Sequence, residues 1–310
     1  MTAAPQTVVS IAAVVVTYFP DERFGDRIRL LSQQVDKVII VDNGDTDDLR
    51  SGMLSKCSSI VTDLISSGGN VGVARALNVG IERARSLGAN WIATFDQDSE
   101  VEVDYRANMM RAWNALGNAS QIGLLAPVYA YRSIEEASVR RAVRRQHAGS
   151  SPREVTTVMT SGNLVPCATF DRVGPFREDF VIDYVDHEFC LRCRKAGLRI
   201  FEVPDVALLH KLGRLERVKR GPMSATVTHH DAIRRYFMTR NRICVWKEYG
   251  IRNPLWTAQD MIGSVKELAK IALFESQKKK KYSAILQGMS DAFRGRMGWS
   301  PYAVDLVSHE

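Results

Sequence analysis

The sequence has few cysteines and no apolar run long enough to cross a membrane. Its five cysteines are odd in number and scattered, which argues against a disulfide framework and favours a reducing compartment. The apolar segment Val8 to Phe19 is too short to span a bilayer and too rich in β-branched residues for a signal-peptide core, and no basic leader precedes it. These absences predict a cytoplasmic protein whose contact with a membrane is at most peripheral.

Acidic residues are scarce in one part of an otherwise ordinary composition. Residues 211–247 contain ten Lys and Arg against Glu216 and Asp231, a local surplus of +8 in a chain whose net charge is +7. Such a surplus predicts an anionic partner: a diphosphate, a nucleic acid or an acidic membrane face. The sequence has no readable helix-turn-helix, zinc finger or base-stacking platform, so we expect no nucleic acid as a partner.

Short apolar segments alternate with amphipathic segments through the first part of the chain. The periodicity predicts strands at 11–16, 37–41, 59–65 and 91–95 and helices at 21–34 and 73–87. Such alternation is typical of right-handed βαβ units, and so of an α/β, Rossmann-like, mostly parallel sheet flanked by helices. A polar cluster follows each predicted strand. Because ligands bind beyond the carboxyl ends of strands in such sheets, we expect the functional site there.

The acidic pair Asp96 and Asp98 follows the fourth predicted strand. Side chains two residues apart in an extended segment point the same way, so both carboxylates leave on one side. Two close carboxylates repel each other unless a cation lies between them, and Mg²⁺ or Mn²⁺ is the usual solution. A metal held in this way keeps positions for phosphate oxygens, so the pair predicts a diphosphate substrate. A pair of solvated loop aspartates is the alternative.

The last sixty residues differ in character from the rest. An apolar stripe lies opposite a charged face there, the stripe being Met261, Ile262, Val265, Leu268, Ala269 and Ala272. Four lysines and a weaker amphipathic stretch follow. Two interpretations stay open: a helical hairpin that packs on the core, or an in-plane membrane anchor whose lysines meet anionic headgroups. We therefore expect a domain 1–250, with halves 1–130 and 131–250, and an amphipathic helical region 251–310.

Five motifs occur in an order that resembles a known family. They are Val14-Val15-Val16-Thr17-Tyr18, Val41-Asp42-Asn43-Gly44, Gly69-Asn70-Val71-Gly72-Val73-Ala74, Phe95-Asp96-Gln97-Asp98-Ser99 and Asp183-Tyr184-Val185-Asp186-His187-Glu188. Over residues 11–250 the chain resembles inverting family-2 glycosyltransferases with the GT-A fold, and among them bacterial rhamnosyltransferases, whose metal motif commonly reads Asp-Gln-Asp-Ser. The resemblance implies a dTDP-β-L-rhamnose donor, Mg²⁺ or Mn²⁺, and transfer to a hydroxyl of a glycan or glycolipid. The same fold with a UDP- or GDP-sugar is the alternative.

The resemblance places the donor at the strand ends. The expected donor-binding set is Thr17, Asp42, Asn43, Asn70, Gly72, Arg75, Asn78, Asp96, Gln97, Asp98 and Arg240. Asp42 offers an acceptor to the nucleoside, although capping of the turn at Asn43 explains it too. Arg75 either binds the donor or is a solvated helix charge. Asp96 is expected to bind ribose or to reach the metal through water, Asp98 to ligate it directly, and His210 to be a third ligand, a diphosphate contact or a core histidine.

Inverting transfer also needs a base that takes the proton from the attacking hydroxyl. Alignment of the last motif on Cys190 and Arg192 places the family's base at Asp186. Val185 replaces the family's preceding Glu, so Asp183, three residues before Asp186, stays open as the base. Asp186 is also a plausible helix N-cap. We expect the acceptor to be bound by Glu188 together with Ser161, Gly162 and Asn163.

A basic segment further on resembles the family's Arg-x-Tyr-Tyr-x-x-Arg-Asn. It contains Arg234, Tyr236, Arg240 and Asn241, with Phe237 in place of the second Tyr. We expect Arg240 to close over the phosphates, although a basic helix face on a membrane explains the arginines equally well. An amphiphilic acceptor at the cytoplasmic face of the membrane suits this segment. The oligomeric state is left open, a dimer included, and a non-catalytic nucleotide-sugar sensor is the remaining alternative.

Overall fold

The structure is a computed structural model that describes residues 8–44, 57, 59–131, 150–210, 216–220 and 223–308. The chain divides into two compact units. The sheet unit comprises residues 1–176 and 193–211, and the helical unit comprises residues 177–192 and 212–310. The expected domain boundary at residue 250 stays a prediction.

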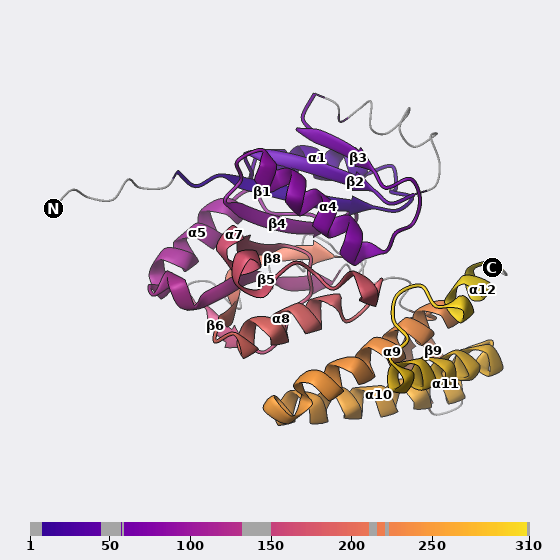
Figure 1. The fold of residues 1–310 in the computed structure, drawn as a ribbon. Helices are drawn as coiled ribbons and strands as arrows, with labels where there is room; N and C mark the ends of the chain where they lie inside the picture. The colour runs from indigo at the N-terminus through magenta and orange to yellow at the C-terminus, as the bar shows by residue number, and fades with distance from the viewer. Residues whose placement is uncertain are drawn as a thin grey trace. The chain divides into compact units, whose positions relative to one another are not determined.

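Among the described residues, the sheet unit is built on eight strands in the order β3-β2-β1-β4-β7-β5-β8-β6 (Figure 1). These are β1 (Ile11–Thr17), β2 (Lys37–Asp42), β3 (Asp63–Ser66), β4 (Trp91–Asp96), β5 (Ile122–Tyr131), β6 (Arg153–Val155), β7 (Asn163–Pro166) and β8 (Arg199–His210). The first four strands pair in parallel, as do β5 and β8, while β7 and β6 run antiparallel to their neighbours. The prediction of a mostly parallel α/β sheet is confirmed.

Helices cover both faces of this sheet. They are α1 (Phe24–Ser32), α4 (Val73–Ser86), α5 (Tyr105–Leu116) and α7 (Cys167–Val173), with the short turn η1 (Ala119–Gln121). Helix α4 lies directly on β1, because a Cβ added to Gly80 would come within 2.4 Å of Val14 Cγ1. The alternate residues of β1 bury against α1 and α5 in the main core, which includes Ile11, Val15, Phe24, Ile28, Tyr105 and Met109. Successive residues of β1 thus point to opposite faces of the sheet, so that Ile11 and Val15 pack on α1 and α5 while Val14 packs on α4.

Two parts of the sheet unit differ from the expectation. The segment 132–154 reads as a polar loop, but its last two residues begin β6, which pairs with β8. Residues 132–149 lie outside the described residues. The apolar runs at 198–203 and 206–209 predict two separate strands, but the structure has the single strand β8 there. This strand keeps pairing with β5 across an irregularity at Pro127 and Val128.

The helical unit contains mainly helices. They are η2 (Glu178–Phe180), the start of α8 (Val185–Lys195), α9 (Ala232–Tyr249), η3 (Gly250–Arg252), α10 (Pro254–Phe274), α11 (Lys278–Arg294) and α12 (Pro301–Ser308). A hairpin of β9 (Glu216–Arg220) and β10 (Met223–Val227), which the basic composition did not predict, precedes α9. A Cβ on Gly288 would lie 2.6 Å from Tyr236 O, so α11 packs backbone to backbone on α9. Among the described helices, none is long and apolar enough to cross a bilayer.

Candidate active site

The acidic pair lies where β4 ends. Asp96 is the last residue of β4 and Asp98 lies in the turn that follows, where Ser99 N donates to Asp96 O at 3.1 Å. The register places Asp96 beside Val16 of the parallel strand β1, so the pair lies at the carboxyl edge of the parallel strands. Both aspartates are half-buried. The predicted position at a strand end is confirmed.

A serine from the segment before β7 supports this turn. Ser161 Oγ accepts from Asp96 N at 3.1 Å and lies 2.7 Å from Ser99 Oγ. Ser161 is only 1% exposed, so its hydroxyl serves the turn and is not presented to an acceptor. Gly162 is buried as well, with a φ of 80° and Pro127 Cγ at 2.6 Å from the Cβ it lacks. Both residues thus support the turn from inside the sheet unit, and their expected contact with the acceptor stays a prediction.

Asn163 differs from these two neighbours. It is buried in β7, opposite Thr94 of β4. Its Oδ1 has no hydrogen-bond partner among the described residues, although a buried amide oxygen ordinarily has one. The acceptor contact expected of Asn163 stays a prediction.

Gln97 holds the turn from the other side. Its Oε1 accepts from Tyr18 N at 2.6 Å and its Nε2 donates to Tyr18 O at 2.9 Å, so the amide completes a backbone-like pair with the end of β1. Arg27 Nε donates to Gln97 O at 2.8 Å from α1. Gln97 thus orients the turn through both polar atoms of its side chain, and its expected contact with the donor stays a prediction. Sequence reasoning overlooked Arg27; the signal is its place on the apolar face of α1, between Phe24 and Ile28.

Thr17 and Asp42 end β1 and β2 side by side. Thr17 Oγ1 donates to Asp42 Oδ1 at 3.3 Å, and Gly44 N donates to the same oxygen at 3.1 Å. Both residues are buried. The turn-capping role of Asp42 is confirmed, and its contact with a nucleoside stays a prediction.

Two asparagine side chains join the loops after β2 and β3. Asn43 Nδ2 donates to Asn70 Oδ1 at 3.2 Å, and Asn43 Oδ1 accepts from Val71 N at 2.9 Å. Asn70 Oδ1 also accepts from Gly72 N at 3.0 Å. These amides fix the shape of the loop that leads into α4. Their expected contact with the donor stays a prediction.

Helix α4 begins at this loop with an open N-terminus. Gly72 adopts a φ of 87°, which favours glycine, and among the described contacts no side chain caps the helix. Its first turn has no acidic residue and carries the exposed Arg75. Such an N-terminus suits a phosphate. Asn78 is different: its Nδ2 and Oδ1 both bond Phe176 backbone atoms at 2.9 Å, which is a structural role, and its expected contact with the donor stays a prediction.

The donor set at the β4 turn fits a hard divalent cation. Asp96 and Asp98 supply carboxylate oxygens, and within the described residues no group of three or more His, Cys, Asp and Glu side chains is placed to hold a metal. Mg²⁺ is typically held by one or two carboxylates together with substrate phosphates rather than by a complete protein cage. The side chain of His210, at the end of β8, lies outside the described residues, and its expected role as a ligand stays a prediction.

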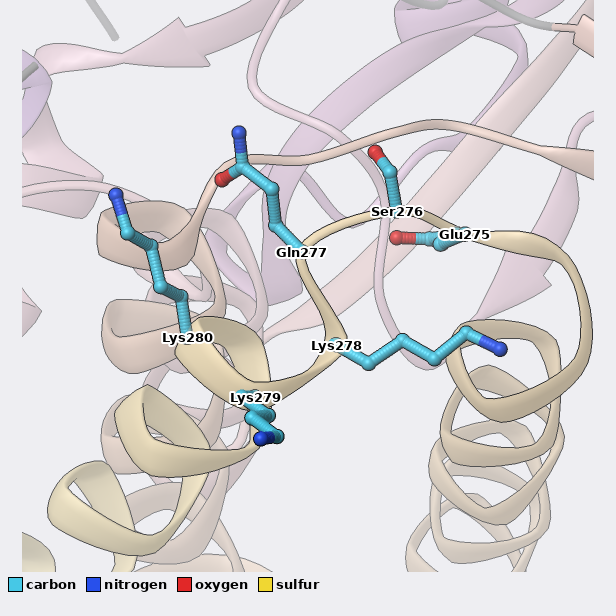
Figure 2. A pocket seen from close by; sticks show the side chains of 6 residues that line it. All are labelled: Glu275, Ser276, Gln277, Lys278, Lys279 and Lys280. Carbon is cyan, nitrogen blue, oxygen red and sulfur yellow. The ribbon is translucent and has the colours of Figure 1, made fainter.

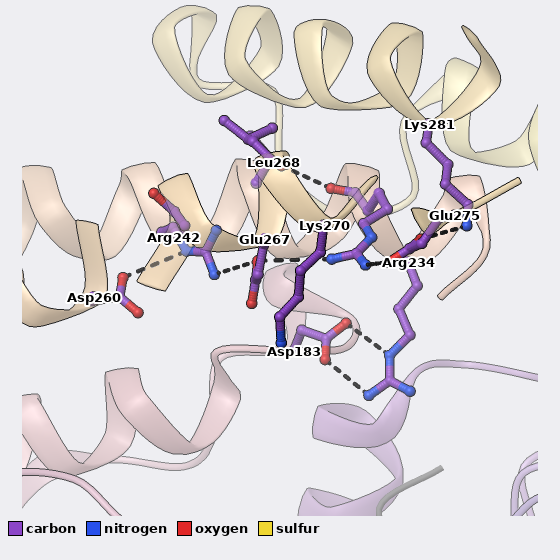
Figure 3. Close-up of polar contacts among 12 residues, drawn as sticks. Asp183, Arg234, Arg242, Asp260, Glu267, Leu268, Lys270, Glu275 and Lys281 are labelled. Atoms are coloured by element: carbon purple, nitrogen blue, oxygen red, sulfur yellow. Dashed lines mark hydrogen bonds and ion pairs between the residues drawn. The ribbon is translucent and has the colours of Figure 1, made fainter. Parts of the chain in front are cut away.

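The carboxylates proposed as the base lie in the helical unit. Both oxygens of Asp183 bond Arg234, at 3.1 and 3.2 Å (Figure 3). Asp186 is half-buried in the first turn of α8, not at its N-cap as the sequence suggested, and its Oδ1 accepts from His187 N at 2.7 Å. Of these two, only Asp183 is engaged through both oxygens by an arginine.

Glu188 is fully buried. Its carboxylate accepts from Tyr249 Oη at 2.7 Å and from Arg192 Nη2 at 3.0 Å. Burial together with the carboxylate of Glu188 raises the pKa of the Tyr249 hydroxyl, which stays a donor. The carboxylate is a buried partner of Tyr249 and Arg192, and its expected contact with the acceptor stays a prediction.

Arg240 is also fully buried. Its guanidinium donates to the backbone oxygens of Gly298 at 2.5 Å, Asp179 at 3.0 Å and Phe180 at 3.3 Å. Burial lowers the pKa of Arg240, a further sign of a dry environment. Carbonyl groups of the helical unit thus engage the guanidinium of Arg240, and its expected closure over the phosphates stays a prediction.

Asn241 is the residue of this motif for which sequence reasoning had no role. Its Nδ2 donates to the backbone oxygens of Phe180 and Ile182 at 2.8 Å and of Asp183 at 2.9 Å. The segment so held is unusual, since Val181, Asp183 and Tyr184 all have positive φ. Asn241 therefore fixes the strained approach to α8 and Asp186.

Comparisons with known proteins identify the family. The family model described as "Glycosyl transferase family 2" matches residues 13–145. The chain is 30% identical to "dTDP-rhamnosyl transferase RfbF" of Shigella flexneri over 242 residues, covering 75% of this chain and 78% of that protein. It is 24% identical over 280 residues to "N-acetylglucosaminyl-diphospho-decaprenol L-rhamnosyltransferase" of Mycobacterium tuberculosis, covering 80% and 88%.

A solved structure supports the same fold. The mannosyltransferase PcManGT from Pyrobaculum calidifontis, in complex with GDP-Man and Mn²⁺, superposes with a TM-score of 0.55 and 17% identity, covering 99% of this chain and 81% of that one. At that identity the likeness concerns the fold alone, which is GT-A. With a 30% identical relative covered over most of its length, the chain belongs to glycosyl transferase family 2 and is a glycosyltransferase.

Proposed function

We propose that this glycosyltransferase moves L-rhamnose from dTDP-β-L-rhamnose, with inversion, to a hydroxyl of a glycan or a lipid-linked acceptor. The observation that carries the proposal is the Asp96–Asp98 turn at the carboxyl edge of β4, braced by Gln97 and Ser161. The 30% identity to a dTDP-rhamnosyl transferase supports the choice of donor.

In this proposal the nucleoside lies at the ends of β1 and β2. Asp42 accepts a hydrogen bond from the nucleoside, and the exposed ring of Tyr18, 47% exposed, offers a face to the base. The diphosphate lies between the acidic turn and the open N-terminus of α4, where Arg75 adds a positive charge. These roles use the side chains of the sheet unit that are not wholly occupied by structural bonds.

Asp98, with Asp96, would hold Mg²⁺ or Mn²⁺ in the donor complex. A bound divalent ion supplies Lewis-acid neutralisation of the charge that develops on the departing diphosphate. The protein's own contribution is to fix the two carboxylates, through Ser161 on the backbone of Asp96 and Gln97 on β1. A turn held at both sides needs little reorganisation when the donor binds.

Asp186 is proposed as the base. Its Oδ1 is used by His187 N, so Oδ2 takes the proton of the attacking hydroxyl. The oxygen of that hydroxyl bonds to the anomeric carbon while the bond from this carbon to the diphosphate breaks and dTDP departs. Asp183 is the weaker candidate, because taking a proton would break its two-point pair with Arg234. An acceptor carried by a lipid would also require the enzyme at the cytoplasmic face of a membrane.

Donor choice is tested by thermal shift and by donor hydrolysis with a panel of nucleotide sugars, each with Mn²⁺ and with EDTA. We expect dTDP-rhamnose with Mn²⁺ to raise the melting temperature most and to be hydrolysed. Preference for a UDP- or GDP-sugar would refute the rhamnose assignment while leaving the family intact. Binding without any turnover would instead indicate a nucleotide-sugar sensor.

A further inference from the structure

Helix α10 turns its two acidic side chains toward the rest of the helical unit. Asp260 accepts a hydrogen bond from Tyr184 Oη at 2.8 Å. Glu267 accepts from Arg242 Nη2 at 3.1 Å (Figure 3). Ile271 is the one residue of α10 that is buried. The helix is therefore held mainly by polar contacts of its charged side. Its apolar stripe is not the face that packs on the rest of the helical unit.

The apolar stripe of α10 lies on the outward face instead. Its exposed large side chains are Leu255, Met261, Ile262, Val265, Leu268 and Leu273. Leu255 is 80% exposed and Val265 is 64% exposed. The helix extends over roughly 30 Å at its normal rise, and a continuous exposed apolar face of that size marks an interaction site.

Helix α11 adds to this surface. Tyr282 Oη donates to Leu268 O at 3.0 Å, which joins the two helices along one edge. On α11 the exposed apolar side chains are Leu286, Met289 and Phe293. We call the outward apolar residues of α10 and α11 together the apolar face.

The acidic residues of both helices are used internally. Glu275 accepts from Arg235 at 2.9 Å and from Lys281 at 2.6 Å, and Asp291 accepts from Tyr236 Oη at 2.8 Å. Both carboxylates are 1% exposed. Since the two acids of α10 are paired as well, the fully exposed charges of α10 and α11 are Lys and Arg.

The turn between the helices concentrates this positive charge. Lys278, Lys279 and Lys280 open α11 beside a shallow hollow that Ser276 and Gln277 also line (Figure 2). The N-terminus of α11 has no acidic residue in its first turn, and a helix N-terminus is itself partly positive. A cationic cluster thus borders the apolar face.

We propose that the apolar face docks the enzyme on an anionic lipid surface, with α10 lying in the interfacial plane. The apolar side chains would enter the boundary between headgroups and acyl chains, and Lys266, Lys279 and Lys280 would meet the anionic headgroups. Neither helix spans a bilayer, so the contact is peripheral.

Charge favours a lipid surface over a second copy of this chain. Two apolar faces packed on each other would bring their lysine borders together, and no exposed acid on these helices would meet them. An anionic bilayer offers the missing negative charge along the whole border. The face therefore complements a membrane better than itself.

The test is co-sedimentation of the full-length protein with vesicles of phosphatidylcholine alone and of phosphatidylcholine with 30% phosphatidylglycerol (on the order of the anionic content of a cytoplasmic leaflet). We expect binding to the anionic vesicles, weakened by salt. The double variant Ile262→Glu/Val265→Glu should lower the partition coefficient at least about tenfold, since it places charge in the inserted face. The double variant Lys279→Gln/Lys280→Gln should lower the partition coefficient about fivefold per lysine on the anionic vesicles and should leave it unchanged on phosphatidylcholine vesicles.

Val103→Glu is the matched control, because Val103 is 73% exposed but belongs to the sheet unit, and it should bind as the unaltered protein does. Circular dichroism melting verifies that each variant folds. The measurement contains no donor, so its outcome is independent of the proposed reaction. Equal binding of the double variant and the unaltered protein would overturn the proposal. A second result would also overturn it: the unaltered protein forms a dimer in analytical ultracentrifugation, the double variant is a monomer, and neither binds vesicles. That result would assign the face to a second copy of the chain.

Discussion

Replacing Asn241 by leucine should loosen the segment that leads to the proposed base. The substitution keeps the volume of the side chain and removes the Nδ2 donor that faces three backbone oxygens, those of Phe180, Ile182 and Asp183. An amide has two hydrogens, so about two full hydrogen bonds are lost. Leaving buried carbonyls unpaired costs ~1–3 kcal/mol each, and part is recovered by relaxation, so we expect about 2–4 kcal/mol.

The loss should be local, because the carbonyls belong to one strained segment. Val181 has a φ of 66°, and residues held in such conformations store ~1–3 kcal/mol each when their surroundings enforce them. Once Asn241 no longer enforces it, the segment should relax and displace the start of α8. If Asp186 is the base, turnover should fall while the affinity for the donor changes little.

Hydrogen exchange followed by mass spectrometry measures this directly. Amides of residues 179–186 should exchange about 30- to 1000-fold faster in Asn241→Leu, the factor that corresponds to about 2–4 kcal/mol of local opening. Thr239→Val is the matched control on the same helix: it removes only the bond from Thr239 Oγ1 to Arg235 O, at 2.9 Å, and should leave the segment unchanged. Equal exchange in the two variants would refute the reasoning.

Three further predictions concern charged side chains. Asp98→Asn should abolish Mn²⁺-dependent donor hydrolysis without changing the melting temperature of the protein without ligands; full activity in EDTA would contradict it. Asp186→Asn should keep donor binding in calorimetry but lower transfer at least about 100-fold, whereas the same result for Asp183→Asn would move the base to that residue. Burial, with Arg234 and Arg235, lowers the pKa of His230 to about 4. As pH falls from about 6.5 to 4, the imidazole of His230 takes up a proton in the unfolded chain before it does so in the folded one, so acid destabilises the helical unit. After allowance for partial exposure, we expect the free energy of unfolding to fall by about 1–2 kcal/mol between pH 7 and pH 4.5. Urea unfolding at the two pH values measures this loss, and His230→Gln should abolish it.

The positions of the acidic pair and of the strand ends were predictable from local pattern. A buried β-branched run followed by polar residues places a side chain at a sheet edge whatever the rest of the chain does, so Asp42 and Asp96 lie at the ends of β2 and β4 as expected. Which partner a polar side chain finds was not predictable. Gln97 uses the backbone of Tyr18, 79 residues away, and such pairs arise from tertiary packing that no local spacing records.

The burial of Arg240 was not predictable either, because a guanidinium is more often a surface group. Five donors in a rigid fork can satisfy several backbone oxygens at once, so an arginine is a good filler for a turn that leaves carbonyls unpaired. The segment around Asp179 and Phe180 is such a turn, and Arg240 is buried there. The family motif marked the residue as important without saying that its importance is structural.

The orientation of α10 follows the same energetics. The period of the helix predicts an apolar stripe and a charged stripe, but not which of them faces inward. The choice is made by Arg242 of α9, which is nearly enclosed in the helical unit, because an unpaired buried guanidinium costs ~3–5 kcal/mol. Turning Asp260 and Glu267 inward pairs Arg242, whereas turning the leucines inward would bury apolar area and leave Arg242 without its carboxylate partners. The apolar residues of α10 are therefore left on the outward face, which is the surface that we propose meets the lipid.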